Sequence, residues 1–157
     1  MIPIGISTIA VTAQDMQYTS GLGLSIDEVL SGSYGNGNKY VVYDDESQRF
    51  RAGILPQEYR ADAAEEIGGV LRLTTDYVSV GQYTGGGDAR KYVIHIDLID
   101  AGTGAVLQST DLYGGEPPQR VKRSIVDFDD NRYGDKPSDE KITAACLSLI
   151  GKQELEE

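Results

Sequence analysis

The chain has 157 residues, of which 39% are hydrophobic and 25% are charged, and its formal net charge is −11. This composition is typical of one soluble globular domain and argues against extensive disorder. The acidic balance argues against nucleic acid and anionic membranes as partners, because binding to phosphate groups relies on cationic side chains. The same acidity fits a surface that keeps the protein soluble, attracts a basic partner, or mimics nucleic acid.

The small numbers of cysteine and histidine residues limit the disulfides and metal sites that the chain can form. Cys146 is the only cysteine and His95 the only histidine, so neither an internal disulfide nor a Cys/His zinc site is expected. No run of about 18 apolar residues occurs, so membrane insertion is not expected. The start, MIPIGISTIAVTAQDM, lacks the basic region of a signal peptide. The expected location is cytoplasmic, or the envelope or periplasm if a signal segment has been removed.

The first half of the chain is predicted to alternate short helices, strands and loops. Ser25 is a suitable N-cap for a short helix, and Asp27 and Glu28 favour its first turn. A second short helix is predicted from near Asp62 to the pair Gly68-Gly69, because glycine is common just after a helix. The other segments are predicted as strands at 2–12 and 39–43 and as loops at 32–38 and 44–51.

Residues from about 70 to 113 are predicted to form an antiparallel meander, because runs rich in valine, isoleucine and threonine alternate with turn signals. The predicted segments are VLRLTT (70–75) and YVSVGQY (77–83), as one long strand or two, a loop at 84–90, and a hairpin of strands 92–100 and 105–113. By alternation, one face of the first hairpin strand should enter the core, with Tyr92, Ile94, Ile96 and Leu98.

The C-terminal part is predicted to contain one helix behind an acidic loop. The prolines of GGEPPQ (114–119) should end the sheet, and RVKRSIVDF (120–128) could add an edge strand. Ser138 should cap a helix to residue 150 that has one apolar stripe, followed by a frayed acidic tail at 152–157. The predicted fold is therefore α+β: residues 1–151 form one domain, with an antiparallel sheet and two or three short helices packed on one face.

One hairpin resembles a recurrent bacterial pattern. In LIDAGTGAVL (98–107), Asp100, Thr103 and Gly104 match the "lvDxxTGxvl" hairpin of curli-secretion (CsgG-like) and TolB amino-terminal-like envelope domains, and Gly81 matches an earlier glycine. The resemblance covers about residues 67–113. It implies an envelope-associated interaction domain without catalysis, and it supplies no site residues. The same D-x-x-T-G pattern also suits any tight hairpin with a left-handed glycine.

Three stretches of the sequence are candidate sites. His95 and Asp97 share a strand face, but residues two apart on a strand lie roughly 6.5–7 Å apart. The two side chains can therefore hydrogen-bond only with the help of their rotamers, which favours a surface or pairing role over catalysis. The glycine-rich loop 84–90 could cradle a phosphate, yet it joins two strands and so favours a simple hairpin turn. A weak calcium site, the one cofactor considered, would use four carboxylates of the acidic loop: Asp127, Asp129, Asp130 and Asp135.

The function that these patterns favour is a non-catalytic module that binds a protein or a small anionic ligand through loops at one end of the sheet. A homo-oligomer is left open. One alternative is a small acidic inhibitor or nucleotide-sequestering protein of phage or mobile-element origin, and another is a metal- or histidine-dependent hydrolase. The predicted contact residues are Arg90, Lys91, Tyr113, Arg120, Lys122, Arg123 and Tyr133.

Overall fold

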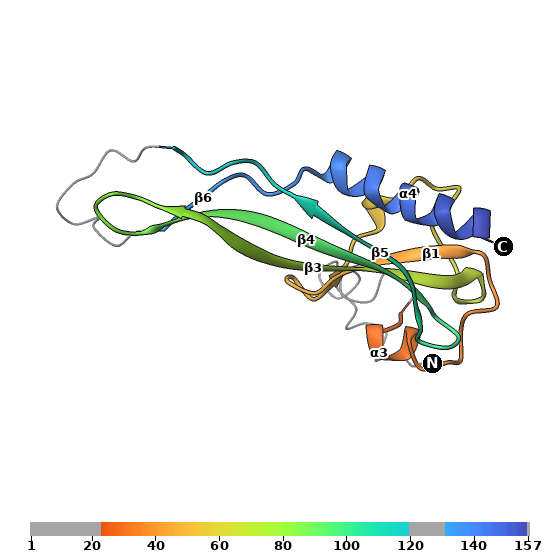
Figure 1. The fold of residues 1–157 in the computed structure, drawn as a ribbon. Helices are drawn as coiled ribbons and strands as arrows, with labels where there is room; N and C mark the ends of the chain where they lie inside the picture. Colours follow the sequence, from red (N-terminus) through yellow and green to blue (C-terminus); the bar gives the residue numbers. More distant parts are fainter. Residues whose placement is uncertain (1–22, 120–130, 157) are drawn as a thin grey trace.

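A computed structural model of the chain describes residues 23–119 and 131–156. In these residues one mixed sheet of six strands is accompanied by two α-helices and two 3-10 turns (Figure 1). The elements in chain order are α3 (Ile26–Val29), β1 (Lys39–Asp44), β2 (Arg49–Phe50), η1 (Ala52–Ile54), η2 (Ala64–Glu66), β3 (Ile67–Gln82), β4 (Asp88–Asp100), β5 (Val106–Tyr113), β6 (Arg132–Tyr133) and α4 (Asp139–Glu156). The strands predicted at 2–12 and 120–128 lie outside the described residues.

The strands follow the order β2-β1-β3-β4-β5, and β6 pairs with β4. The antiparallel pairing of β3 with β4 and of β4 with β5 confirms the predicted meander. The prediction of a purely antiparallel sheet is wrong, however, because β1 runs parallel to β3 and β6 runs parallel to β4. A parallel neighbour requires a long crossover. Here the crossover is the segment that carries β2 and both 3-10 turns, between β1 and β3.

The hairpin of β3 and β4 extends beyond the rest of the fold. β3 is one strand of 16 residues, so the stretches at 70–75 and 77–83 are continuous. β1 pairs with β3 only as far as Leu73, whereas the pairing of β3 with β4 continues to Gln82. In Figure 1 this outer part of the hairpin projects past α4 to the left. We call residues 75–94 the arm and the rest of the described fold the body.

Both faces of the sheet are covered in the body, by different helices. On one face, Ile96 and Leu98 of β4 pack with Ile142 and Leu149 of α4. On the other face, strand residues pack with Val29 of α3. Figure 1 shows α4 and α3 on opposite sides of the sheet. The prediction that the helices share one face is therefore wrong, although Ile94, Ile96 and Leu98 do point into the core as predicted.

The serines predicted as N-caps do cap the two α-helices. Ser25 Oγ accepts from the amide of Glu28 at 3.2 Å, and the Glu28 carboxylate accepts from the amide of Ser25 at 3.1 Å, which is a capping box. At α4, Ser138 Oγ accepts from the amide of Lys141 at 3.3 Å. The helix continues to Glu156, so the predicted end at residue 150 is too early.

The helix predicted from Asp62 to Gly68-Gly69 is absent. The single turn η2 occupies part of this segment, and both glycines lie in β3. A β-carbon at Gly68 would lie 2.3 Å from the carbonyl oxygen of Gly37. These glycines thus allow two backbone segments to approach closely, which the sequence does not distinguish from a helix end. The predicted loop at 44–51 likewise contains β2, whose Phe50 packs edge-on against Tyr43 at 5.1 Å between ring centroids.

Candidate functional site

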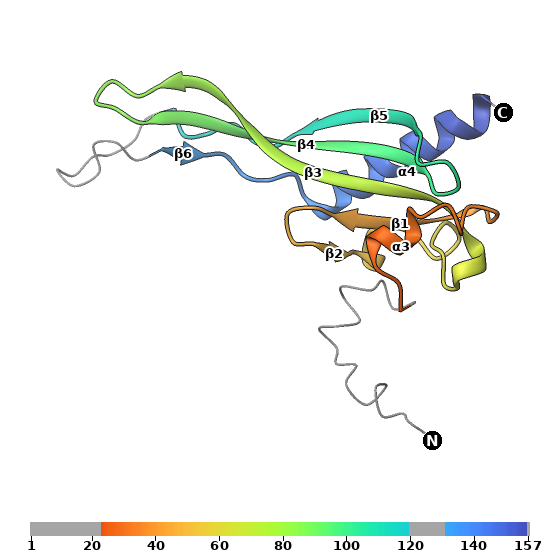
Figure 2. The same ribbon diagram turned by 90° about the horizontal axis from the view of Figure 1, so that it is seen from below.

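The arm continues the face that α4 covers in the body, but with different side chains. Tyr77 of β3 lies opposite Tyr92 of β4, and Ser79 lies opposite Arg90. In the body, the cross-strand pairs on this same face are aliphatic, as in the pair of Leu73 and Ile96. Figure 2 shows β6 beside the outer part of β4, where Tyr133 joins the cluster. Since α4 does not reach this far, the arm is held together by aromatic and cationic contacts.

The guanidinium of Arg90 is the centre of this cluster. Its ζ carbon lies 4.3 Å from the ring centroid of Tyr77 and 5.5 Å from that of Tyr133. Arg90 Nη1 also donates to the Tyr133 hydroxyl at 2.6 Å. The Tyr133 ring stacks on Tyr92 with centroids 5.1 Å apart and meets Tyr77 edge-on at 5.7 Å. Sequence analysis named Arg90 and Tyr133 as separate loop residues, and the structure brings them into one stack.

The cations of this face have partners. Arg90 Nη2 lies 3.3 Å from an oxygen of Asp88, and Lys136 Nζ lies 2.8 Å from an oxygen of Glu46. The hydrogen bond to Tyr133 is the main cause that raises the pKa of Arg90, and that to Glu46 is the main cause that raises the pKa of Lys136. Both side chains therefore stay charged, although the buried Nε of Arg90 has no hydrogen-bond partner among the described residues. A free anion at this face would have to compete with the carboxylates of Asp88 and Glu46.

Lys91 and Tyr113 lie on the opposite face of the arm. Lys91 Nζ is 2.8 Å from an oxygen of Glu116 and 5.6 Å from the ring centroid of Tyr113. Val78 lies directly opposite Lys91, and Tyr113 lies opposite Val93. Adjacent residues on a strand point to opposite faces. The predicted contact residues at 90 and 91 therefore belong to two surfaces rather than to one site.

The remaining predicted residues do not form a site in the described part of the chain. Arg120, Lys122 and Arg123, and likewise Asp127, Asp129 and Asp130, lie outside the described residues. Asp135 is exposed, and its carbonyl accepts from the amide of Gly115 at 2.9 Å. Within 23–119 and 131–156, no group of three or more acidic, histidine or cysteine side chains could hold a metal ion. The calcium site remains a prediction.

The glycine-rich loop forms a tight hairpin turn. The amide of Tyr83 donates to the carbonyl of Gly87, and the amide of Gly86 donates to the carbonyl of Tyr83, each at 3.0 Å. Gly86 and Gly87 both have positive φ, of 114° and 85°, which glycine adopts at low cost. These amides bond within the turn itself, in agreement with the hairpin interpretation and not with a phosphate cradle.

His95 contacts two carboxylates on the face of the sheet opposite α4. Its Nδ1 lies 2.6 Å from Asp111 Oδ1 on β5, and its Nε2 lies 2.8 Å from Asp97 Oδ1. The rotamers of His95 and Asp97 thus bring the two side chains together across the strand spacing. Ser109 donates to Asp97 rather than to the imidazole. Both ring nitrogens face carboxylates, so the ring is not placed to activate a hydroxyl.

The surroundings of Cys146 do not suit a nucleophile or a metal ligand either. It is fully buried in the core under α4, and burial raises the pKa of its thiol to about 12. A thiol with such a pKa is neither a good nucleophile nor a good metal ligand at neutral pH.

The titration of His95 can be predicted from these contacts. The hydrogen bond to Asp111 is the largest cause that raises the pKa of His95 above its ordinary value of about 6.5. Because the folded-state pKa exceeds the unfolded one, the stabilisation is fully present below about pH 6.5 and is lost as the pH rises through the folded pKa. In an NMR titration we expect Asp111→Asn to lower the pKa of His95 more than Asp97→Asn does. A native pKa at or below about 6.5 would contradict this reading.

Large apolar side chains are exposed mainly on and beside the arm. The set there is Tyr77, Val78, Val80, Tyr113 and Tyr133, and the exposed large apolar side chains of the described body are Val106, Leu107 and Leu155. Sequence analysis missed Val78 and Val80, since an apolar strand ordinarily indicates burial. The available signal was the length of the strand-forming stretch from 67 to 83, which exceeds what one short helix can cover.

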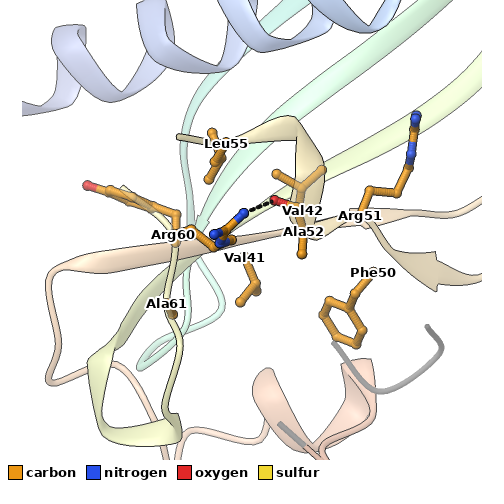
Figure 3. Close-up of a pocket in the computed structure, with 9 residues that line it drawn as sticks. Val41, Val42, Phe50, Arg51, Ala52, Leu55, Arg60 and Ala61 are labelled. Atoms are coloured by element: carbon orange, nitrogen blue, oxygen red, sulfur yellow. Dashed lines mark hydrogen bonds between the residues drawn. The ribbon is translucent and has the colours of Figure 1, made fainter. Parts of the chain in front are cut away.

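Figure 3 shows a small apolar pocket in the body, between β1 and the 3-10 turn η1. It holds about 10 Å³ of free space, roughly the room that one water needs. Arg60 Nη1 closes one side by donating to the carbonyl of Ala52 at 3.1 Å. This pocket is too small for an organic ligand.

Comparison with protein-family models, curated proteins and solved structures finds no match to this chain. No helix in the described part of the chain combines the length and apolar character required to traverse a lipid bilayer.

Proposed function

We propose that this chain is a non-catalytic protein-binding module whose contact surface is the arm. The observation that carries the proposal is the concentration of exposed aromatic and aliphatic side chains on and beside the arm. Tyr77, Val78 and Val80 lie on β3, and Tyr113 of β5 and Tyr133 of β6 lie next to it. Isolated exposed apolar residues are normal, but a cluster on one element is typical of an interaction site. Tyrosine is also enriched at protein interfaces.

The charges of the arm favour a protein over a small anionic ligand. Arg90, Lys91 and Lys136 each contact a carboxylate of this chain. An anion would have to displace these carboxylates and would also meet a net charge of −11. Stacked rings and valines, by contrast, can be buried by a partner without breaking an ion pair.

The test is a selection of peptides from a random phage-displayed library on the immobilised full chain. We expect the selected peptides to bind Val80→Ser at least tenfold more weakly than the unmodified chain, because the substitution replaces an apolar contact on the arm. Val106→Ser is the matched control. Val80 is 49% exposed on the arm and Val106 is 55% exposed at the other end of the sheet, so both substitutions should leave the fold intact.

Peptides that bind Val80→Ser as tightly as the unmodified chain, or that lose affinity only for Val106→Ser, would place the contact surface elsewhere. Absence of any selected peptide would count against a peptide-binding role.

A further inference from the structure

We propose that the arm binds its partner as an added β-strand along the free edge of β3, and that this strand is extended and basic. The inference rests on the proposed function and specifies how the arm is used. Strand addition uses main-chain hydrogen bonds for affinity and alternate side chains for specificity. The geometry of β3, the composition of its edge and the charge beside it support this mode.

The outer edge of β3 loses its partner where the arm begins. In the body that edge is occupied by β1, and just after β1 ends, the amide of Asp45 donates to the carbonyl of Leu73 at 2.9 Å. From Thr74 to Gln82, β3 pairs with β4 alone among the described residues. Within residues 23–119 and 131–156, the edge of the sheet is therefore open along the projecting part of the strand.

The hydrogen bonds of β4 identify the outward-facing groups. The carbonyl of Tyr92 accepts from Gly114 at 2.8 Å and that of Arg90 accepts from Gly134 at 3.0 Å, so both carbonyls point away from β3. In an antiparallel pair, residues opposite such positions also direct their main-chain groups outward. These residues are Tyr77 and Ser79. The same alternation places Thr75 outward as well.

The amide of Tyr77 gives independent evidence for this orientation. It donates to Oδ1 of the neighbouring Asp76 at 2.8 Å, which requires it to point away from β4. A local carboxylate thus occupies the amide in the absence of a partner strand. An incoming carbonyl would replace this bond and leave the Asp76 carboxylate available for a cation.

The free edge lacks the usual protection against strand pairing. Proteins commonly place lysine, proline or a bulge on such an edge. The stretch TTDYVSVGQ (74–82) has neither lysine nor proline, and its threonine, tyrosine and valine favour strands. The register shift between Ser79 and Gly81 comes only near the tip. A partner strand can therefore pair with the outward main-chain groups of Thr75, Tyr77 and Ser79.

The negative charge beside the free edge of β3 indicates which kind of partner strand would bind there. Asp76 is the one charged residue of the stretch 74–82, and its carboxylate accepts from the amide of Tyr77 on the outer edge. A second copy of this chain would bring another Asp76 and another net charge of −11 to the same edge. A strand that carries lysine or arginine instead meets Asp76 favourably, while its alternate apolar residues meet Tyr77.

The test uses a blocked synthetic peptide that alternates lysine and valine, and two control peptides. One control replaces a central valine by proline and keeps the charge, and the other replaces every lysine by glutamate. Fluorescence anisotropy with the full chain should show at least tenfold weaker binding of both controls. Equal binding of the proline peptide would reduce the interaction to charge attraction and overturn strand addition.

Variants of the chain test the edge itself. We expect Ser79→Pro to bind the lysine–valine peptide at least tenfold more weakly than the matched Ser79→Ala, because proline removes the outward amide. Proline is tolerated at an edge position whose amide is not in the ladder. On peptide addition, the amide of Tyr77 should also become protected from hydrogen exchange in the unmodified chain.

The outcomes separate this inference from the proposed function. If Val80→Ser weakens the display-selected peptides while Ser79→Pro matches Ser79→Ala, the arm binds partners but not by strand addition. If Val80→Ser has no effect, the proposed function itself fails. Concentration-dependent dimerisation in gel filtration that Ser79→Pro abolishes would assign the edge to a second copy and overturn the choice of a basic partner.

Discussion

Replacing Ile96 by alanine is expected to lower the free energy of unfolding by about 2–5 kcal/mol, as for other buried isoleucine and leucine truncations. Ile96 has 0% exposure in the central strand β4, where it packs in the same core cluster as Cys146 and Leu149 of α4. The truncation leaves a cavity between sheet and helix, which neither element can collapse to fill. Urea denaturation followed by circular dichroism measures the loss.

The control for Ile96→Ala is Val78→Ala. Val78 is 40% exposed on the arm, so its truncation should change the free energy of unfolding by less than about 1 kcal/mol. A loss of less than about 1 kcal/mol for Ile96→Ala would contradict the packing of α4 on this face.

The second large effect is expected for Gly37→Ala. A β-carbon at Gly37 would lie 2.1 Å from both the carbonyl carbon and the carbonyl oxygen of Glu66, so the added methyl group would collide with backbone rather than with a flexible side chain. One of the two segments must move, and this movement strains the parallel pairing of β1 with β3 that begins next to it. Overpacking of this kind typically costs about 1–3 kcal/mol and occasionally more.

Gly53→Ala is the matched control for Gly37→Ala. A β-carbon at Gly53 would meet no atom within 4 Å, and its φ lies outside the positive range. We therefore expect the melting temperature to fall clearly for Gly37→Ala and to stay level or rise for Gly53→Ala. Equal melting temperatures for the two variants would show that the two segments are not in contact.

The parts of the fold that sequence analysis predicted are those with local causes. The turn between β4 and β5 is an example: Gly104 has a φ of 77°, and its amide donates to the carbonyl of Asp100 at 2.7 Å. The side chain of Asp100 also accepts from the amide of Gly102 at 2.7 Å. Each of these roles follows from the residue type and its position in the turn, so the hairpin could be placed without a structure.

The predictions that were wrong concern how segments far apart in the sequence pack together. Nothing in the apolar run of β1 indicates that it lies parallel to β3 or that it ends at Asp44, beside the middle of that strand. The same holds for the two helices, whose apolar residues fit either face of the sheet equally well. Such choices depend on which surfaces remain uncovered once the other elements have packed.

Only some residues of the candidate site were predicted from the sequence, and their arrangement was not. Arg90 and Tyr133 are 43 positions apart, yet a hydrogen bond joins them, while the neighbours Arg90 and Lys91 point to opposite faces. Strand alternation could have separated 90 from 91. The pairing of β6 with β4, which brings Tyr133 to Arg90, has no local signal in a two-residue strand.

The continuity of β3 and β4 from body to arm has a consequence for local stability. In the body these strands are buried under α4 and α3, whereas in the arm they depend on rings, ion pairs and their own ladder. The hairpin can therefore open from its tip while the body stays folded, since opening there exposes little core. Amide hydrogens that face into the ladder should accordingly exchange in two classes, those beyond Thr75 by partial opening and those near Leu71 only by global unfolding.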